Sequence, residues 1–126
     1  WYAYYTHEKY SDNKNDRGHW FLPESHLWEY FPVLNAEVQA LSEVVLTGDD
    51  LGPAGTSTKA IHTNAWDIGG KRYLLAVNAT NEAADCELSG LRGETAQVMF
   101  EDRQVQVVEG KVKDSFGPYA RHVYVY

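Results

Sequence analysis

Regularly spaced turn signals are the feature that most constrains the fold of this chain. From residue 43 onward, short segments rich in valine and leucine alternate with turns rich in glycine, asparagine and aspartate. Two apolar-rich runs in residues 58–80 are joined by Gly69–Gly70, which is the pattern of a tight β-hairpin. Further turns are predicted at Asp102–Arg103 and at Glu109–Gly110. About eight short strands at this spacing predict a mainly β fold, an antiparallel β-sandwich that begins near residue 43.

The first 42 residues follow a different pattern. Trp1–Tyr5 contains only aromatic or small residues and predicts one short strand buried on both faces. A polar stretch without periodicity follows and predicts a loop. Apolar residues then recur at helical spacing over Leu27–Leu41, so we expect one amphipathic helix. Pro32 either kinks this helix or lies in its first turn, after a separate turn of the chain. Residues 43–48 are expected to form the first sandwich strand, and residues 49–57 a loop.

The acidic charge balance excludes two classes of partner. The chain carries 11 Lys and Arg against 18 Asp and Glu, a formal net charge of −7. Nucleic-acid surfaces and anionic membranes attract proteins with a basic excess. No apolar run approaches the roughly 18 residues of a membrane-spanning helix. We therefore predict no nucleic-acid partner and no membrane partner, while neutral ligands such as sugars stay open.

Motifs that carry chemistry are scarce. Cys86 alternates with Leu88 and is expected to be a small buried apolar side chain. The histidines and acidic residues between His7 and His26 match no zinc or EF-hand spacing, and no phosphate-binding loop or nucleophile elbow occurs. We predict no metal, no cofactor and no catalytic residue. Asn78–Thr80 matches the N-glycosylation triplet inside a predicted strand, and we interpret it as a chance match.

Two parts of the sequence resemble a known family. The predicted helix and its exit resemble the last barrel helix of bacterial TIM-barrel glycoside hydrolases: WEYFPVLNAEVQALSEVVLTGD. The later segments resemble the small β-sandwich that often follows such a barrel: GGKRYLLAVNATNEAADCELSGL and VMFEDRQVQVVEGKVKDSFGPYARHVYVY.

This resemblance implies a division of the chain into two domains. Residues 1–42 would be a remnant of the catalytic barrel, with Trp1–Tyr5 as its last strand, and residues 43–126 would be the C-terminal β-sandwich domain. In the resembling enzymes the catalytic carboxyl groups lie on earlier barrel strands, which this sequence lacks. Because Met99 is the only methionine, we expect the catalytic body to lie upstream in the same polypeptide. The predicted function is non-catalytic, namely packing against that barrel of a glycoside hydrolase and stabilising it.

A sugar-binding role is the alternative prediction. Aromatic rings stack on the C–H faces of sugars, and neighbouring polar groups bind the hydroxyls. The resemblance matches Trp1 to an aromatic sugar platform on the last barrel strand, and Tyr5 lies on the same predicted strand. His62, Asn64 and Trp66 alternate onto one face of a later strand. These five residues would give a carbohydrate-binding module for a poly- or oligosaccharide, whereas packing is the competing interpretation for Trp66.

A third interpretation is a self-contained secreted protein trimmed of its signal peptide, in which Trp1–Tyr5 finds sheet partners within this chain or in a second copy. The sequence does not fix the compartment, and a secreted or periplasmic location is only an expectation. A strand and helix stripped of a barrel expose apolar area, which favours self-association of the piece.

Overall fold

The computed structural model describes residues 25–126, with side chains from residue 29 onward. The chain divides after Val38, and Gln39–Tyr126 forms the second of two compact units. The predicted strand Trp1–Tyr5 and the loop after it lie outside the described residues. Helix α1 is followed by nine strands. The elements are α1 Ser25–Thr47, β1 Asp49–Gly52, β2 Gly55–Thr56, β3 Ile61–Ile68, β4 Lys71–Asn78, β5 Ala84–Ser89, β6 Thr95–Val98, β7 Arg103–Gln106, β8 Lys111–Phe116 and β9 Arg121–Val125.

Helix α1 confirms the predicted helix and is longer than expected, at 23 residues. It runs through Pro32 as one helix, so the interpretation with a separate turn before Pro32 is wrong. A proline inside a helix removes one backbone hydrogen bond, and here the remaining bonds of the long helix outweigh that loss.

The strand predicted over residues 43–48 is wrong, because residues up to Thr47 form the end of α1. Val44 is only 5% exposed and Leu41 is half-buried, so apolar side chains are buried three residues apart, at helical rather than strand spacing. The Gly48 N–H donates to the Val44 carbonyl oxygen at 3.0 Å and completes the last turn.

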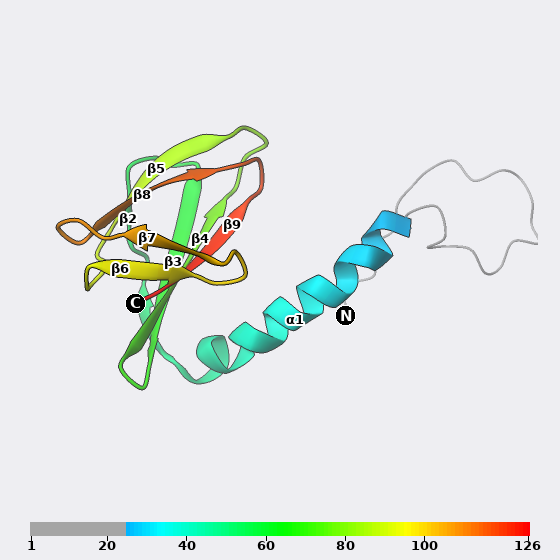
Figure 1. Cartoon of the computed structure of the whole chain (residues 1–126), viewed down its shortest axis with the longest axis horizontal. Coiled ribbons are helices and arrows are strands. Elements are labelled where there is room, and N and C mark those ends of the chain that lie inside the picture. The colour runs from blue at the N-terminus through cyan, green and yellow to red at the C-terminus, as the bar shows by residue number, and fades with distance from the viewer. Residues whose placement is uncertain (1–24) are drawn as a thin grey trace, which may run out of the picture. The chain divides into compact units, whose positions relative to one another are not determined.

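The strands form the predicted antiparallel sandwich (Figure 1). The larger sheet has six strands in the order β1-β3-β4-β9-β6-β7, and the smaller has three in the order β2-β5-β8. The loop predicted over residues 49–57 is partly wrong, since β1 and β2 lie within it. Both are short outermost strands whose hydrogen bonds come from the neighbouring strand, so glycine-rich composition did not prevent pairing.

The hairpin of β3 and β4 is confirmed and fixes the register of the larger sheet. Ile68 pairs with Lys71 across the two-residue turn, and every pair back to Ile61 and Asn78 follows in step. Gly69 and Gly70 both have positive φ angles, of 63° and 82°, which is the backbone that a tight hairpin turn requires.

The core lies between the two sheets. It is built from the inward-facing positions of both, and each fully buried large side chain there stabilises the fold by about 2 kcal/mol. Cys86 is 3% exposed within this core, as predicted. The core residues are Ile61, Ala65, Leu74, Ala76, Cys86, Leu88, Leu91, Ala96, Val98, Val107, Val112, Phe116 and Tyr124.

Candidate functional site

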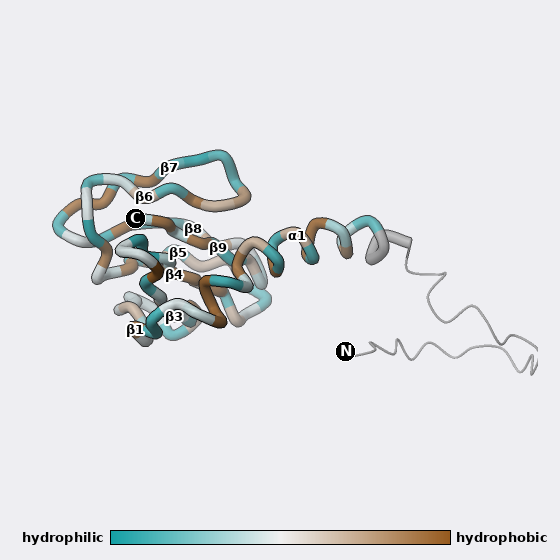
Figure 2. The backbone as a smooth tube through the Cα atoms, turned by 90° about the horizontal axis from the view of Figure 1, so that it is seen from below, coloured by the Kyte–Doolittle hydropathy of each residue, from teal (hydrophilic) through white to brown (hydrophobic). Residues whose placement is uncertain are grey.

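On the face that points away from the core, the larger sheet is apolar along its central strands β4 and β9. On β9, Val123 and Val125 are 1% and 9% exposed, yet they point opposite to the core residue Tyr124. Their partners on β4 are Leu75 and Tyr73, both half-buried. The brown segments of Figure 2 follow β4 and β9 through the centre of this sheet. An antiparallel sheet normally carries polar residues on its second face, so this face is unusual.

Trp66 extends this face onto β3. It pairs with Tyr73 in the register, and Tyr73 pairs with Val125, so the three side chains form one row across β3, β4 and β9. We call Trp66, Tyr73, Leu75, Val123 and Val125 the large-sheet outer face. Tyr73 was missed in the sequence, although a turn at Gly69–Gly70 places it opposite Trp66 by counting residues outward.

The predicted sugar-binding residues divide into two groups. Trp1 and Tyr5 lie outside the described residues. His62, Asn64 and Trp66 lie on one face of β3, and Trp66 belongs to the large-sheet outer face. His62 is exposed, whereas Asn64 and Trp66 are half-buried. Their role in sugar binding stays a prediction.

Asn64 already has an internal partner. Its side-chain N–H donates to Asp50 Oδ1 at 3.0 Å. The same oxygen accepts the Gly52 N–H at 2.8 Å. The hydrogen bond from Gly52, followed by that from Asn64, lowers the pKa of Asp50 below its ordinary value. This cluster holds β1 beside β3 and leaves fewer donors for a ligand.

A shallow hollow of about 260 Å³ lies at one end of the large-sheet outer face. The Lys71 ammonium lies 5.9 Å from the centre of the Tyr73 ring, so it covers part of the aromatic face. The Gln97 amide N–H donates to the Arg103 carbonyl oxygen at 3.0 Å. The lining residues are Lys71, Tyr73, Gln97, Met99, Val125 and Tyr126.

The end of α1 lies against β3 at Trp66. A Cβ atom at Gly48 would lie 3.3 Å from the Trp66 Cβ and 2.5 Å from the Val44 carbonyl oxygen. Only glycine fits this approach without a shift of the backbone. Val45 and Leu46, in the last turn, are 50% and 80% exposed. Apolar surface therefore continues at the helix end.

A polar cluster joins the two sheets on the opposite side of the larger sheet. Arg103 Nε donates to Glu101 Oε2, and Arg103 Nη2 donates to Asp114 Oδ2, both at 2.8 Å. The Tyr124 hydroxyl donates to the same Asp114 oxygen at 2.6 Å. The His122 Nδ1 atom lies 2.5 Å from Glu101 Oε1. We call these five residues the inter-sheet clasp, because Asp114 belongs to β8 of the smaller sheet while Arg103, His122 and Tyr124 belong to the larger.

The clasp keeps its carboxyl groups ionised. Burial raises the pKa of Asp114, but hydrogen bonds from Arg103 and Tyr124 outweigh it and bring the pKa below its ordinary value. Glu101 follows the same balance, since burial is outweighed by hydrogen bonds from His122 and Arg103. The hydrogen bond to Asp114 raises the pKa of Arg103, and burial followed by the bond to Asp114 raises that of Tyr124. The cluster is thus a set of satisfied ion pairs.

The aromatic residues at the end of the chain also pack internally. His122, Tyr124 and Tyr126 alternate with valines in this segment. Tyr124 is 0% exposed and belongs to the core. The His122 ring packs on Phe116, with ring centres 4.5 Å apart. Both rings pack internally, so neither offers a flat exposed surface to a ligand.

Asn78 is fully buried and organises the loops at one end of the sandwich. Its amide N–H groups donate to the Glu82 and Gly117 carbonyl oxygens at 2.7 and 2.9 Å. Its Oδ1 accepts the N–H and the hydroxyl of Thr80 at 3.0 and 2.8 Å. A side chain held in this way is inaccessible to glycosylation, which agrees with the interpretation of the triplet as a chance match.

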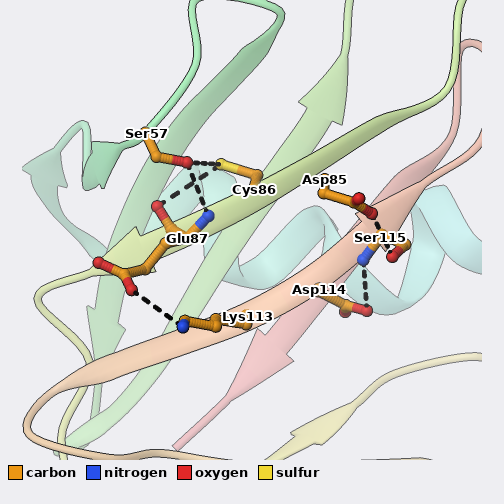
Figure 3. Close-up of a pocket in the computed structure, with 7 residues that line it drawn as sticks. All are labelled: Ser57, Asp85, Cys86, Glu87, Lys113, Asp114 and Ser115. Atoms are coloured by element: carbon orange, nitrogen blue, oxygen red, sulfur yellow. Dashed lines mark hydrogen bonds and ion pairs between the residues drawn. The ribbon is translucent and has the colours of Figure 1, made fainter.

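The smaller sheet carries a polar hollow of about 550 Å³ (Figure 3). Its groups bind one another: the Ser115 hydroxyl donates to Asp85 Oδ1 at 2.6 Å, and the Glu87 N–H donates to the Ser57 hydroxyl at 2.9 Å. No aromatic ring lines it. The hollow therefore lacks the stacking surface of a sugar site.

No group of His, Cys, Asp and Glu within residues 25–126 has the arrangement of a metal site. The one helix in this part of the chain is too polar to cross a membrane.

Comparison with known proteins gives structural relatives only. No protein-family profile matches the chain, and no curated protein matches it. AmyP, solved in complex with maltose, superposes on 80% of the chain with a TM-score of 0.64 and 12% identity. An Anoxybacillus α-amylase superposes on 79% with a TM-score of 0.61 and 18% identity. The maltogenic α-amylase AmyB of Thermotoga neapolitana superposes on 72% with a TM-score of 0.55 and 15% identity.

The chain has the fold of one segment of α-amylase-family glycoside hydrolases. It spans only about a fifth of their length, namely 20%, 22% and 23% of the three chains. At these identities the likeness concerns the fold, and it agrees with the β-rich C-terminal domain that the sequence resemblance implied.

Proposed function

We propose that this chain is the C-terminal, non-catalytic β-sandwich of a glycoside hydrolase, preceded by the last helix of its catalytic barrel. The sandwich packs against that barrel and stabilises it. The proposal extends a fold likeness in which the chain corresponds to about a fifth of each relative, from 20% to 23%. The remaining four fifths of such a polypeptide would contain the catalytic carboxyl pair.

The exposed apolar residues of α1 are the observation that carries the proposal. Tyr30, Leu34 and Val38 recur every four residues and are 73%, 51% and 58% exposed. Val33 adds to the same region at 53% exposed. A helix of a soluble protein buries such a stripe, which contributes roughly 25 cal/mol for each Å² removed from water. A neighbouring barrel strand and helix would supply that cover.

The experiment is a truncation of the natural polypeptide. Its upstream coding sequence is determined first, and the enzyme is then compared with a version that ends at Thr47, just before β1. We expect the truncated enzyme to unfold at a lower temperature and to lose activity in parallel, because interface area is exposed. A version that ends after Tyr126 but carries Val108→Lys, at a residue 66% exposed, is the matched control. Equal melting temperatures for the full and truncated enzymes would contradict the proposal.

A carbohydrate-binding module is the second candidate. The pairing of Trp66 with Tyr73 favours it, because two adjacent rings on one sheet face can stack on successive sugar units. Calorimetric titration of the chain with maltotriose and with cellotriose tests it. Saturable binding that disappears in Trp66→Ala would support the module, and absence of heat with either sugar would exclude it for these ligands.

A further inference from the structure

We infer that two exposed aromatic side chains, Phe100 and Tyr119, form a binding site for a neutral polysaccharide chain at the loop end of the sandwich. The loop end consists of three turns between strands, namely residues 79–83, 99–102 and 117–120. The inference goes beyond the proposed packing function, and the site is separate from the large-sheet outer face.

Tyr119 occupies a turn position that favours glycine. The Ala120 N–H donates to the Gly117 carbonyl oxygen at 3.1 Å and closes a four-residue turn with Pro118 at its second position. Tyr119, at the third position, has a φ of 54°. A turn with proline second and a positive φ third normally carries glycine or asparagine at that third position, because a Cβ atom is crowded in left-handed backbone. The tyrosine therefore lowers the stability of this turn.

Phe100 repeats this pattern in the turn between β6 and β7. Its φ is 68°, which is rare for a bulky residue. The Arg121 Cζ atom lies 5.8 Å from the centre of the Phe100 ring, so the ring lies at the start of β9, two residues after Tyr119. Phe100 and Tyr119 are 42% and 68% exposed, so burial does not offset their backbone strain. Strain of this kind is typical of residues kept for binding.

The turn that carries Tyr119 is held in place by the hub at Asn78. The Asn78 side-chain amide donates to the Gly117 carbonyl oxygen at 2.9 Å, and its backbone N–H donates to the Ala120 carbonyl oxygen at 2.8 Å. The Tyr119 N–H donates to the Thr80 carbonyl oxygen at 3.0 Å. Because both ends of the turn are fixed, binding a ligand to the ring costs little additional ordering of the backbone.

The surroundings of the rings favour a carbohydrate over a protein partner. Aromatic rings stack on the C–H faces of sugars, while neighbouring polar groups bind the hydroxyls. Asn81 follows Thr80 in the loop end and is exposed, and its side chain has no hydrogen-bond partner within residues 29–126. The centre of a protein interface is depleted of charge, whereas Glu82 and Asp102 are exposed in these same turns.

A long chain suits these rings better than a small sugar does. Phe100 and Tyr119 lie on turns, and neither lines the hollows on the smaller sheet or on the large-sheet outer face. A small ligand gains affinity from a pocket that encloses it. A polysaccharide can instead contact two separate rings with one face, and the second contact is then intramolecular. Glucans of either linkage present such faces.

Adsorption to insoluble polysaccharides tests the inference. The full chain is mixed with granular starch and, separately, with microcrystalline cellulose, and the unbound protein is measured over a range of polymer concentrations. We expect saturable adsorption to at least one polymer, which also identifies the linkage. Tyr119→Ala and Phe100→Ala should each weaken it severalfold, whereas Tyr119→Phe, which keeps the ring, should retain it. Absence of adsorption to both polymers would overturn the inference.

Tyr119→Gly separates binding from folding. Glycine suits a positive φ, so this variant should keep the wild-type melting temperature or raise it, and yet adsorb severalfold more weakly. Val108→Lys, at a residue 66% exposed in the turn between β7 and β8, is the matched control and should adsorb like the wild type. Equal adsorption by all variants, or a loss in Trp66→Ala with none in Tyr119→Gly, would overturn the inference. Either failure leaves the packing function untouched, because the truncation experiment tests that function independently.

Discussion

Replacement of Asn78 by alanine should be among the most destabilising single changes in the sandwich. The buried side chain makes four hydrogen bonds, two to carbonyl oxygens and two from Thr80. Each is worth roughly 0.5–1.5 kcal/mol net, and the carbonyl groups left behind add a desolvation cost. We expect a loss of about 3–4 kcal/mol in the free energy of unfolding. For a domain of this size that lowers the melting temperature by roughly 15–25 °C.

The assay is urea unfolding of the full chain followed by circular dichroism, with calorimetry as an independent readout. Thr80→Val is the control, since it removes the hydroxyl that donates to Asn78 Oδ1 at 2.8 Å and lies 3.2 Å from the Glu82 carbonyl oxygen, and it should cost about 1 kcal/mol. Asn78→Asp separates shape from hydrogen bonding. It keeps the acceptor but places a carboxylate against the Glu82 and Gly117 carbonyl oxygens, so it should be at least as destabilising as alanine at pH 7 and should recover in acid.

The outcome that refutes this reasoning is specific. A melting temperature for Asn78→Ala within about 5 °C of the wild type would mean that the loops at this end do not depend on the amide. Wild-type stability of Asn78→Asp at pH 7 would mean that its two donated bonds contribute nothing.

Three further predictions concern the clasp and the helix end. Because hydrogen bonds lower the folded-state pKa of Glu101 and Asp114, the stability that they contribute should be complete above the ordinary carboxyl pKa and should be lost as the pH falls through the lower folded-state values. Urea midpoints measured at a series of pH values test this, and a wild-type midpoint that does not change in acid would contradict it. Because burial raises the pKa of Tyr124, the free energy of unfolding should also decrease above about pH 10. Tyr124→Phe should cost about 1 kcal/mol at pH 7 and should reduce this alkaline loss of stability. The same alkaline loss in Tyr124→Phe would show that Tyr124 does not cause it. Gly48→Ala should lower the melting temperature by several degrees, because its Cβ would lie 2.5 Å from the Val44 carbonyl oxygen. Gly69→Ala is the comparison, because no atom lies within 4 Å of its Cβ and only the positive φ angle opposes the substitution. An unchanged melting temperature for Gly48→Ala would exclude this close approach.

Local rules were sufficient for the sandwich hairpin but not for the ends of elements. The dipeptide Gly69–Gly70 determined a register that the structure keeps over eight pairs. The segment at Val44 was misread because valine and leucine runs suit both a strand and a buried helix turn, and only burial at the helix end decides between them. The strands β1 and β2 depend on partners supplied by β3 and β5, which composition does not reveal.

The polar contacts could not have been predicted from sequence spacing. Asn78 binds the Gly117 carbonyl oxygen 39 residues away, and the visible signal at Asn78 was an unrelated triplet. Arg103 meets Asp114 across two sheets, so neither local charge pattern nor periodicity points to the pair. His62, Asn64 and Trp66 were correctly assigned to one strand face, because alternation is a local property, whereas the partner row on β4 required the register.

The inter-sheet clasp has a consequence for how this domain avoids amyloid. Strands β7 and β8 are the unpaired margins of their sheets on one side, and an open margin is a template for another chain. The ion pair between Arg103 and Asp114 joins these two edge strands, and β8 also carries two lysines. Addition of a strand from another molecule would have to break this ion pair and remove the lysines from water. The contacts that join the two sheets therefore also oppose fibril growth.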